Sequence, residues 1–115
     1  MSSKEPKVQA IMNIGDGEEI AGMWVTPHIE ETGIYKLLAK KRKDGKYEWA
    51  HFIQRDNGIK EGVFTGVADS KEQLLLVHSL MNQQLSKIFN EHIVLKQADY
   101  DMYTVDGVKR DNSVN

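Results

Sequence analysis

The chain has 115 residues, of which 40% are hydrophobic and 28% charged, and a formal net charge of -2. This length predicts a single domain, and this composition excludes both a disordered chain and a membrane-spanning one. There is no cysteine, which excludes disulfides, thiolate metal sites and cysteine nucleophiles. With no apolar leader segment at the N-terminus, we expect a soluble cytoplasmic protein. We expect one domain over 1–115, with frayed ends at about 1–7 and 105–115 because both are polar and poor in large apolar residues.

The N-terminal part predicts a β-hairpin. A glycine-rich turn at 15–19 leads into a second apolar run at 20–25. Within that run Gly22 is a candidate β-bulge, and Pro27 is expected to end the strand because it cannot donate to a ladder. The first strand is predicted from apolar side chains that alternate with more polar ones, namely Val8, Ala10, Met12 and Ile14.

The basic run KKRKDGK at 40–46 lies at the tip of a second predicted hairpin. A two-residue turn at Asp44 and Gly45 would mix apolar and charged side chains on both faces. A three-residue loop with Gly45 in the left-handed bulge position places Lys40 opposite Glu48 and separates the faces. One face then carries Tyr35, Leu37, Ala39, Tyr47, Trp49, His51 and Ile53, and the other carries Lys36, Leu38, Lys40, Arg42, Lys46, Glu48, Ala50 and Phe52.

The second half predicts one more strand and a long helix. A turn at 56–58 precedes a strand at about 61–68, and Asp69 or Ser70 can open a helix that runs to about Asn90. Residues 92–96 are a short strand or an extended segment laid against the core. The helical stripe comprises Leu74, Val77, Leu80, Met81, Leu85, Ile88 and Phe89. The fold class is therefore α+β: an antiparallel β-meander of about five strands, one long amphipathic helix and a possible short last strand.

A homodimer is the expected assembly, for two reasons. Residues 74–86 carry no formal charge if His78 is neutral, and the non-core side of the helix offers the polar residues Ser79, Asn82, Gln83 and Ser86, a composition that suits an interface. The helix is also expected to cover the sheet face of Tyr35 and Trp49, which leaves Phe52 on the other face. A partner chain or the curled first hairpin must bury it, so Phe52→Asp is expected to cost several kcal/mol. Lys40→Asp, at the hairpin tip, is expected to change stability by no more than about 0.5 kcal/mol.

The leading functional hypothesis is a small binding or interaction protein that recognises a protein or a small ligand, without catalysis and without a cofactor. The residues predicted to contact the ligand or partner are Tyr35, Tyr47, Trp49 and His51, although core packing is the commoner role of such aromatic residues.

The first alternative is single-stranded nucleic-acid binding through the hairpin at 36–46. This stretch has six basic side chains and one acid, and a cluster of this kind can bind phosphates. A solvated hairpin that protects a sheet edge explains the same charge. The side chains proposed to contact nucleic acid are Lys40, Lys41, Arg42, Lys43 and Lys46.

The second alternative is a small enzyme with a His/Glu site made from His28, Glu30 or His51. A solvated loop explains the first two residues and a core histidine the third. The four histidines have no metal-ligand spacing, and the glycines form no phosphate loop, so no metal site is predicted.

Overall fold

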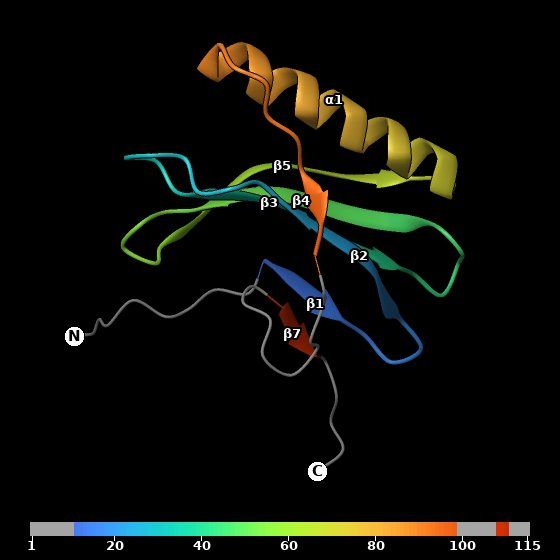
Figure 1. The fold of residues 1–115 in the computed structure, drawn as a ribbon. Helices are drawn as coiled ribbons and strands as arrows, with labels where there is room; N and C mark the ends of the chain where they lie inside the picture. Colours follow the sequence, from blue (N-terminus) through green and yellow to red (C-terminus); the bar gives the residue numbers. More distant parts are fainter. Residues whose placement is uncertain (1–10, 99–107, 111–115) are drawn as a thin grey trace, which may run out of the picture.

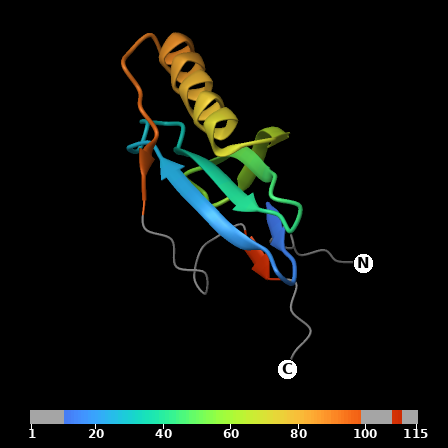
Figure 2. The ribbon, with the colours of Figure 1, turned by 90° about the vertical axis from the view of Figure 1, so that its right-hand side faces the viewer.

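The structure, a computed structural model, describes residues 11–98 and 108–110. Its architecture is α+β, as the sequence predicts: an antiparallel sheet with a long helix on one face and a short pair of strands on the other (Figures 1 and 2). The expected frayed ends lie outside the described residues, except that 108–110 form a short strand.

Five strands form the main sheet, in the spatial order β5-β4-β3-β2-β6, and each neighbouring pair is antiparallel. Four of them form the predicted meander, and β6 adds two residues at the β2 edge. The ladder between β2 and β3 shifts between Ile20 and Gly22, where the glycine suggested a bulge. The strands are β2 Glu19–Val25, β3 Ile34–Lys41, β4 Tyr47–Gln54, β5 Lys60–Ala68 and β6 Lys96–Gln97.

The hairpin between β3 and β4 has the bulged loop that the side-chain pattern predicts. The backbone N–H of Arg42 donates to the carbonyl oxygen of Lys46 over 2.8 Å, and Gly45 has a φ of +86°. Glycine adopts this left-handed conformation without steric cost. Lys40 lies opposite Glu48, so the predicted register and the separation of the two faces are confirmed.

The predicted N-terminal hairpin is wrong. Strand β1, Met12–Ile14, does not pair with β2 but runs parallel to β7, Val108–Arg110, in a separate two-stranded sheet. A turn at 15–18 carries the chain from β1 into β2. Alternating apolar residues identify a strand with one buried face, but they do not specify which strand it pairs with.

Helix α1, Lys71–Phe89, has the predicted ends. The Ser70 hydroxyl accepts a hydrogen bond from the backbone N–H of Gln73, and Asn90 closes the helix in the left-handed conformation with a φ of +54°. The buried residues Leu74, Met81 and Leu85 pack against the sheet face of Leu37 and Ala39, which is the face that the sequence predicts. In the described part of the chain, α1 lacks the apolar character that a helix needs to cross a bilayer.

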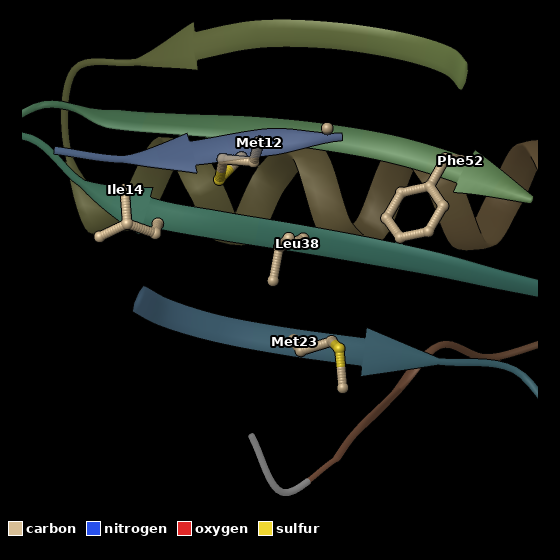
Figure 3. Packing of buried hydrophobic residues seen from close by; sticks show 6 residues of the cluster. Met12, Ile14, Met23, Leu38 and Phe52 are labelled. Atoms are coloured by element: carbon tan, nitrogen blue, oxygen red, sulfur yellow. The ribbon is translucent and has the colours of Figure 1, made fainter. Parts of the chain in front are cut away.

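The opposite face of the sheet is covered by β1 of the same chain. Met12 and Ile14 pack with Met23, Leu38 and Phe52 (Figure 3). Leu38 and Phe52 are completely buried. The face that required either a partner or the N-terminal segment is therefore filled by the N-terminal segment.

Candidate functional site

The flank of α1 that overhangs the outer strand β5 is apolar and exposed. Leu80 and Ile88 were predicted in the buried stripe, but they are 54% and 66% exposed, so this part of the prediction was wrong. These residues lie on one side of the helix, together with Gln84 between them, because they are spaced by four residues. Helical spacing gives the direction of a side chain, whereas its burial depends on how far the sheet extends beneath it.

A groove of about 310 Å³ separates this flank from β5. Its floor is the ring of Trp49, which lies over Gly66: a Cβ atom at Gly66 would approach Trp49 Cζ2 to 2.7 Å. Glycine at this position of β5 is therefore required by the position of the tryptophan. Phe64, which is 46% exposed, forms the outer wall. The groove is lined by Trp49, Phe64, Thr65, Val77, Leu80, Met81 and Gln84.

The strand beneath the groove is an open edge. Within the described residues β5 pairs with β4 on one side, and no strand pairs with its other side. Residues 62–68 carry no charge and no proline. Edge strands are commonly protected by charges, by proline or by a covering segment. The ladder shift between His51 and Phe52 distorts the first half of β5, while 64–68 remains regular and unprotected.

The four residues predicted to contact a ligand or partner share one sheet face but line different cavities or pack in the interior. All four lie on the sheet face that α1 covers, as the confirmed register requires. Trp49 lines the groove, and Tyr47 lines a different cavity beside the first turn of α1. Tyr35 packs against the rings of His51 and Phe89. Tyr35 and His51 are therefore in contact with each other, whereas Tyr47 and Trp49 line different cavities.

His51 is a buried histidine whose ring nitrogens lack hydrogen-bonding partners. It is 1% exposed, and neither Nδ1 nor Nε2 has a partner in the described part of the chain. Its ring lies between those of Tyr35 and Phe64, with centroid separations of 5.5 and 6.4 Å. Burial lowers the pKa of His51 to about 4, because the charged ring would lose its hydration. His51 is therefore neutral at pH 7 and lies directly behind Phe64, the exposed ring of the groove.

The basic hairpin does not present its cations as one patch. Lys40 was expected to be solvated, but it is 6% exposed, and its Nζ donates to the carbonyl oxygen of Asn13 and to Glu18 Oε1, both at 2.7 Å. That expectation was wrong because β1 and the following turn cover the face on which Lys40 lies. The hydrogen bond from Lys40, followed by that from the Gly15 N–H, lowers the pKa of Glu18.

The remaining cations of the run lie at the surface, and two of them have acidic partners. Arg42 contacts Asp44 at 2.7 Å, and Lys46 Nζ lies 3.7 Å from Asp69. Lys41 and Lys43 are exposed, and neither has an ion pair within the described residues. The charge of the run is therefore divided among the interior, two ion pairs and two exposed lysines.

The histidines of the enzyme alternative also occupy separate places. His28 and Glu30 line a cavity of about 630 Å³, together with His92 from the segment after α1. His28 Nε2 lies 2.7 Å from Asp56 Oδ1, and both side chains are more than half exposed. His51 does not line this cavity. No group of three histidine or acidic side chains placed to hold a metal occurs among the described residues.

The polar flank of α1 is occupied by the chain itself. Asn82 Oδ1 accepts from the backbone N–H of Leu95 over 2.8 Å, and Ser86 Oγ bonds both backbone groups of Ile93. His78 Nε2 lies 2.7 Å from the carbonyl oxygen of Leu95. These helical residues hold the segment after α1 against the core, so Asn82 and Ser86 do not support the dimer interface for which the sequence suggested them.

No protein family model, no curated protein and no solved structure matches this chain. The class of protein is therefore defined by the described geometry alone: an α+β domain with an open edge strand next to an apolar groove. Sequence reasoning missed Phe64 and this groove. The available signal was the pair of uncharged stretches, 62–68 and 74–86, but only the strand order shows that β5 lies at an edge.

Proposed function

We propose that the protein is a binding protein that acts as a homodimer, formed by pairing of two β5 edges beneath two α1 helices. The observation that carries the proposal is the coincidence of an open strand edge with exposed apolar side chains on the same side of the molecule. Phe64 projects from β5, and Leu80 projects from the overhanging helix. A strand added beside β5 would cover Phe64 and lie beneath Leu80.

A second copy fits this edge better than an unrelated protein, because the surface is uncharged. A two-fold dimer buries the same patch on both copies, so every charge in that patch would be desolvated twice, a cost that an uncharged patch avoids. Residues 62–68 and 74–86 contain no Asp, Glu, Lys or Arg. The sequence analysis expected a dimer because of an uncovered sheet face and a polar helix flank. The proposal rests on the open edge of β5 in place of these two features.

One register preserves the alternation of side chains along the regular part of β5. Gly66 lies opposite its own copy, and Phe64 lies opposite Ala68 of the second copy, so a large side chain meets a small one. An antiparallel pair on a two-fold axis perpendicular to the sheet keeps both helices on the same face. Leu76, which is exposed, and Leu80 of each helix then approach their counterparts.

The test is the mass of the protein in solution, measured by light scattering and sedimentation at low and high micromolar concentrations. The wild-type protein is expected to be a dimer. Phe64→Asp is expected to be a monomer with an unchanged circular dichroism spectrum, because its carboxylate would be buried in the dimer interface without a partner.

Ile59→Asp is the matched control. Ile59 is 56% exposed and lies in the turn at 56–59, away from the groove, so this variant is expected to remain dimeric. A wild-type protein that stays monomeric at high micromolar concentration refutes the proposal, as does a Phe64→Asp variant that still forms the dimer.

A further inference from the structure

A second cavity, of about 330 Å³, lies beside the first turn of α1, on the flank of the helix away from β5. It is formed where β2 begins, β3 ends and β4 begins. Its volume is at the lower end of the range seen for small-molecule sites. The lining residues that carry the argument are Glu19, Trp24, Lys41, Tyr47, Lys71 and Leu74.

The aromatic walls of this cavity are held in place from behind. The ring of Trp24 lies against Gly22, where an added Cβ would approach Trp24 Cη2 to 2.8 Å. The His78 ring lies 5.5 Å from the Trp24 ring, and His78 Nε2 is 2.7 Å from the Leu95 carbonyl oxygen. Tyr47 packs on the same small core as Trp24. A flat ligand would therefore find two aromatic surfaces that are already positioned.

Two cations line the same cavity. Lys41 lies in a row across the sheet between Glu19 of β2 and Tyr47 of β4, and Lys71 is the first residue of α1. In the described part of the chain the side chain of neither lysine forms an ion pair or a hydrogen bond. Among the residues that line the cavity, Glu19 is the one acid and Lys41 and Lys71 are the two cations, so one positive charge remains in excess.

We propose that this cavity binds a small planar anion, an aromatic ring that carries a carboxylate or a phosphate group. The ring stacks against Trp24 and Tyr47, and the anionic group lies between Lys41 and Lys71, where two ammonium groups can each donate a charge-assisted hydrogen bond. The site gives a role to Lys41, a lysine of the basic run whose side chain makes no ion pair or hydrogen bond within the described residues. It does not depend on the proposed homodimer, because the cavity and β5 lie on opposite flanks of α1.

The test is a titration with 2-naphthoate and 2-naphthyl phosphate, followed by the indole N–H signals of the two tryptophans in an NMR spectrum. Trp24 is expected to show a saturating shift, and Trp49, in the other groove, is expected to show none. The relative affinity of the two probes shows which of the two anionic groups the cavity prefers. Neutral 2-naphthamide is expected to bind at least about tenfold more weakly, since it lacks the charge-assisted hydrogen bonds.

Substitutions to glutamine remove a charge from the cavity while keeping a side chain of similar size, so they test the electrostatic contribution to binding. Lys41→Gln and Lys71→Gln are each expected to weaken binding of the two anions about five- to tenfold. Lys43→Gln removes the same charge at the loop tip, outside the cavity, and is expected to leave binding unchanged. Glu19→Gln is expected to strengthen binding because it removes the acid from the lining.

Three results overturn the proposal. The first is equal affinity of the wild-type protein for 2-naphthamide and 2-naphthoate, or wild-type affinity for the anions in both the Lys41→Gln and the Lys71→Gln variant; either would indicate binding to an apolar cleft without recognition of the charge. The second is a shift of Trp49 in place of Trp24. The third is salt-dependent binding of a single-stranded oligonucleotide without saturable binding of either naphthyl anion, which would favour nucleic-acid recognition by the hairpin.

Discussion

Lys40 and His51 are buried polar side chains on opposite faces of the sheet, and their surroundings differ. Lys40 is fully engaged with Asn13 and Glu18, whereas His51 has no polar partner among the described residues. A buried charge that keeps its partners is stabilised, whereas a buried polar group without partners retains its full desolvation cost. The two residues therefore predict opposite responses to substitution.

The first prediction concerns Lys40. Lys40→Asp is expected to lower the free energy of unfolding by about 3–5 kcal/mol, because it places two carboxylates together and leaves the Asn13 carbonyl unpaired. This replaces the sequence-based expectation of a near-neutral change. Urea unfolding is the measurement, and Lys43→Asp, at the exposed loop tip, is the control, with an expected change within about 0.5 kcal/mol. Equal stability of the two variants would contradict the burial of Lys40.

The second prediction is a pH dependence that originates from His51. The pKa of His51 is about 4 in the folded protein and 6.5 as its ordinary value, so the unfolded chain takes up the proton first as the pH falls. Above pH 6.5 His51 is neutral in both states and does not make the free energy of unfolding depend on pH. Between pH 6.5 and 4 the unfolded chain is protonated first, so the free energy of unfolding falls progressively. The total loss is on the order of 3 kcal/mol.

His51→Leu isolates this effect from other groups that titrate in acid. The variant is expected to keep or raise the stability at pH 7, because it removes an unpaired polar group, and to show a smaller decline than the wild-type protein between pH 6.5 and 4. Urea unfolding at a series of pH values measures both. An identical decline in the two proteins would show that His51 is not protonated preferentially in the unfolded chain.

At the scale of elements, α1 uses its flanks differently. One flank holds the segment after the helix through Asn82, Ser86 and His78, and the other, with Leu80, overhangs the open edge of β5. In the sequence the two flanks cannot be told apart, because residues of both belong to the same uncharged stretch, 74–86. The first flank explains why the short strand β6 reaches the β2 edge, and the second supports the proposed dimer.

The third prediction tests the first of these flanks. Asn82→Leu is expected to lower the free energy of unfolding by about 1–3 kcal/mol, because the buried N–H of Leu95 loses its acceptor. Hydrogen exchange at the Leu95 amide is expected to become faster. Gln83→Leu, at the next and exposed position, is the control and is expected to change stability by less than about 0.5 kcal/mol. Unchanged exchange at Leu95 in Asn82→Leu would refute this role.

At the scale of the whole molecule, the sheet has a core on both faces, and both are supplied by one chain. Helix α1 covers one face, and β1 covers the other (Figure 2). On this second face Met12 and Ile14 of β1 pack with Phe52 (Figure 3). Because Phe52 is buried by residues of its own chain, the fold does not need a partner chain to cover it. Association is proposed at an edge of the sheet, so folding and dimerisation are separable.

The fourth prediction uses this separation. Phe52→Asp is expected to prevent folding, so the milder Phe52→Ala is the informative variant, with an expected loss of about 3–5 kcal/mol from the cavity that it leaves. The loss is expected at low protein concentration as well, because Phe52 is buried within one chain. Urea unfolding of Phe52→Ala and of the exposed control Ile59→Ala provides the comparison. Equal stability of these variants would show that β1 does not cover the second face.

What the sequence by itself determined is local. The register of the β3–β4 hairpin followed from Gly45 and the separation of side chains between faces, and the ends of α1 followed from Ser70 and Asn90. Turn geometry, capping and periodicity act over a few residues, so they can be read from neighbouring positions. The α+β class and the sheet face covered by the helix follow from the same patterns.

What the tertiary structure decided is which segments meet across the chain. The parallel pairing of β1 with β7, the burial of Lys40 and the exposure of Leu80 depend on contacts between residues far apart in sequence. The candidate site has the same origin, because Phe64 becomes the wall of a groove only when β5 is the outer strand. Each side chain prefers burial or solvent according to its own chemistry, but the order of the strands and the layers packed on them decide which of those preferences is met.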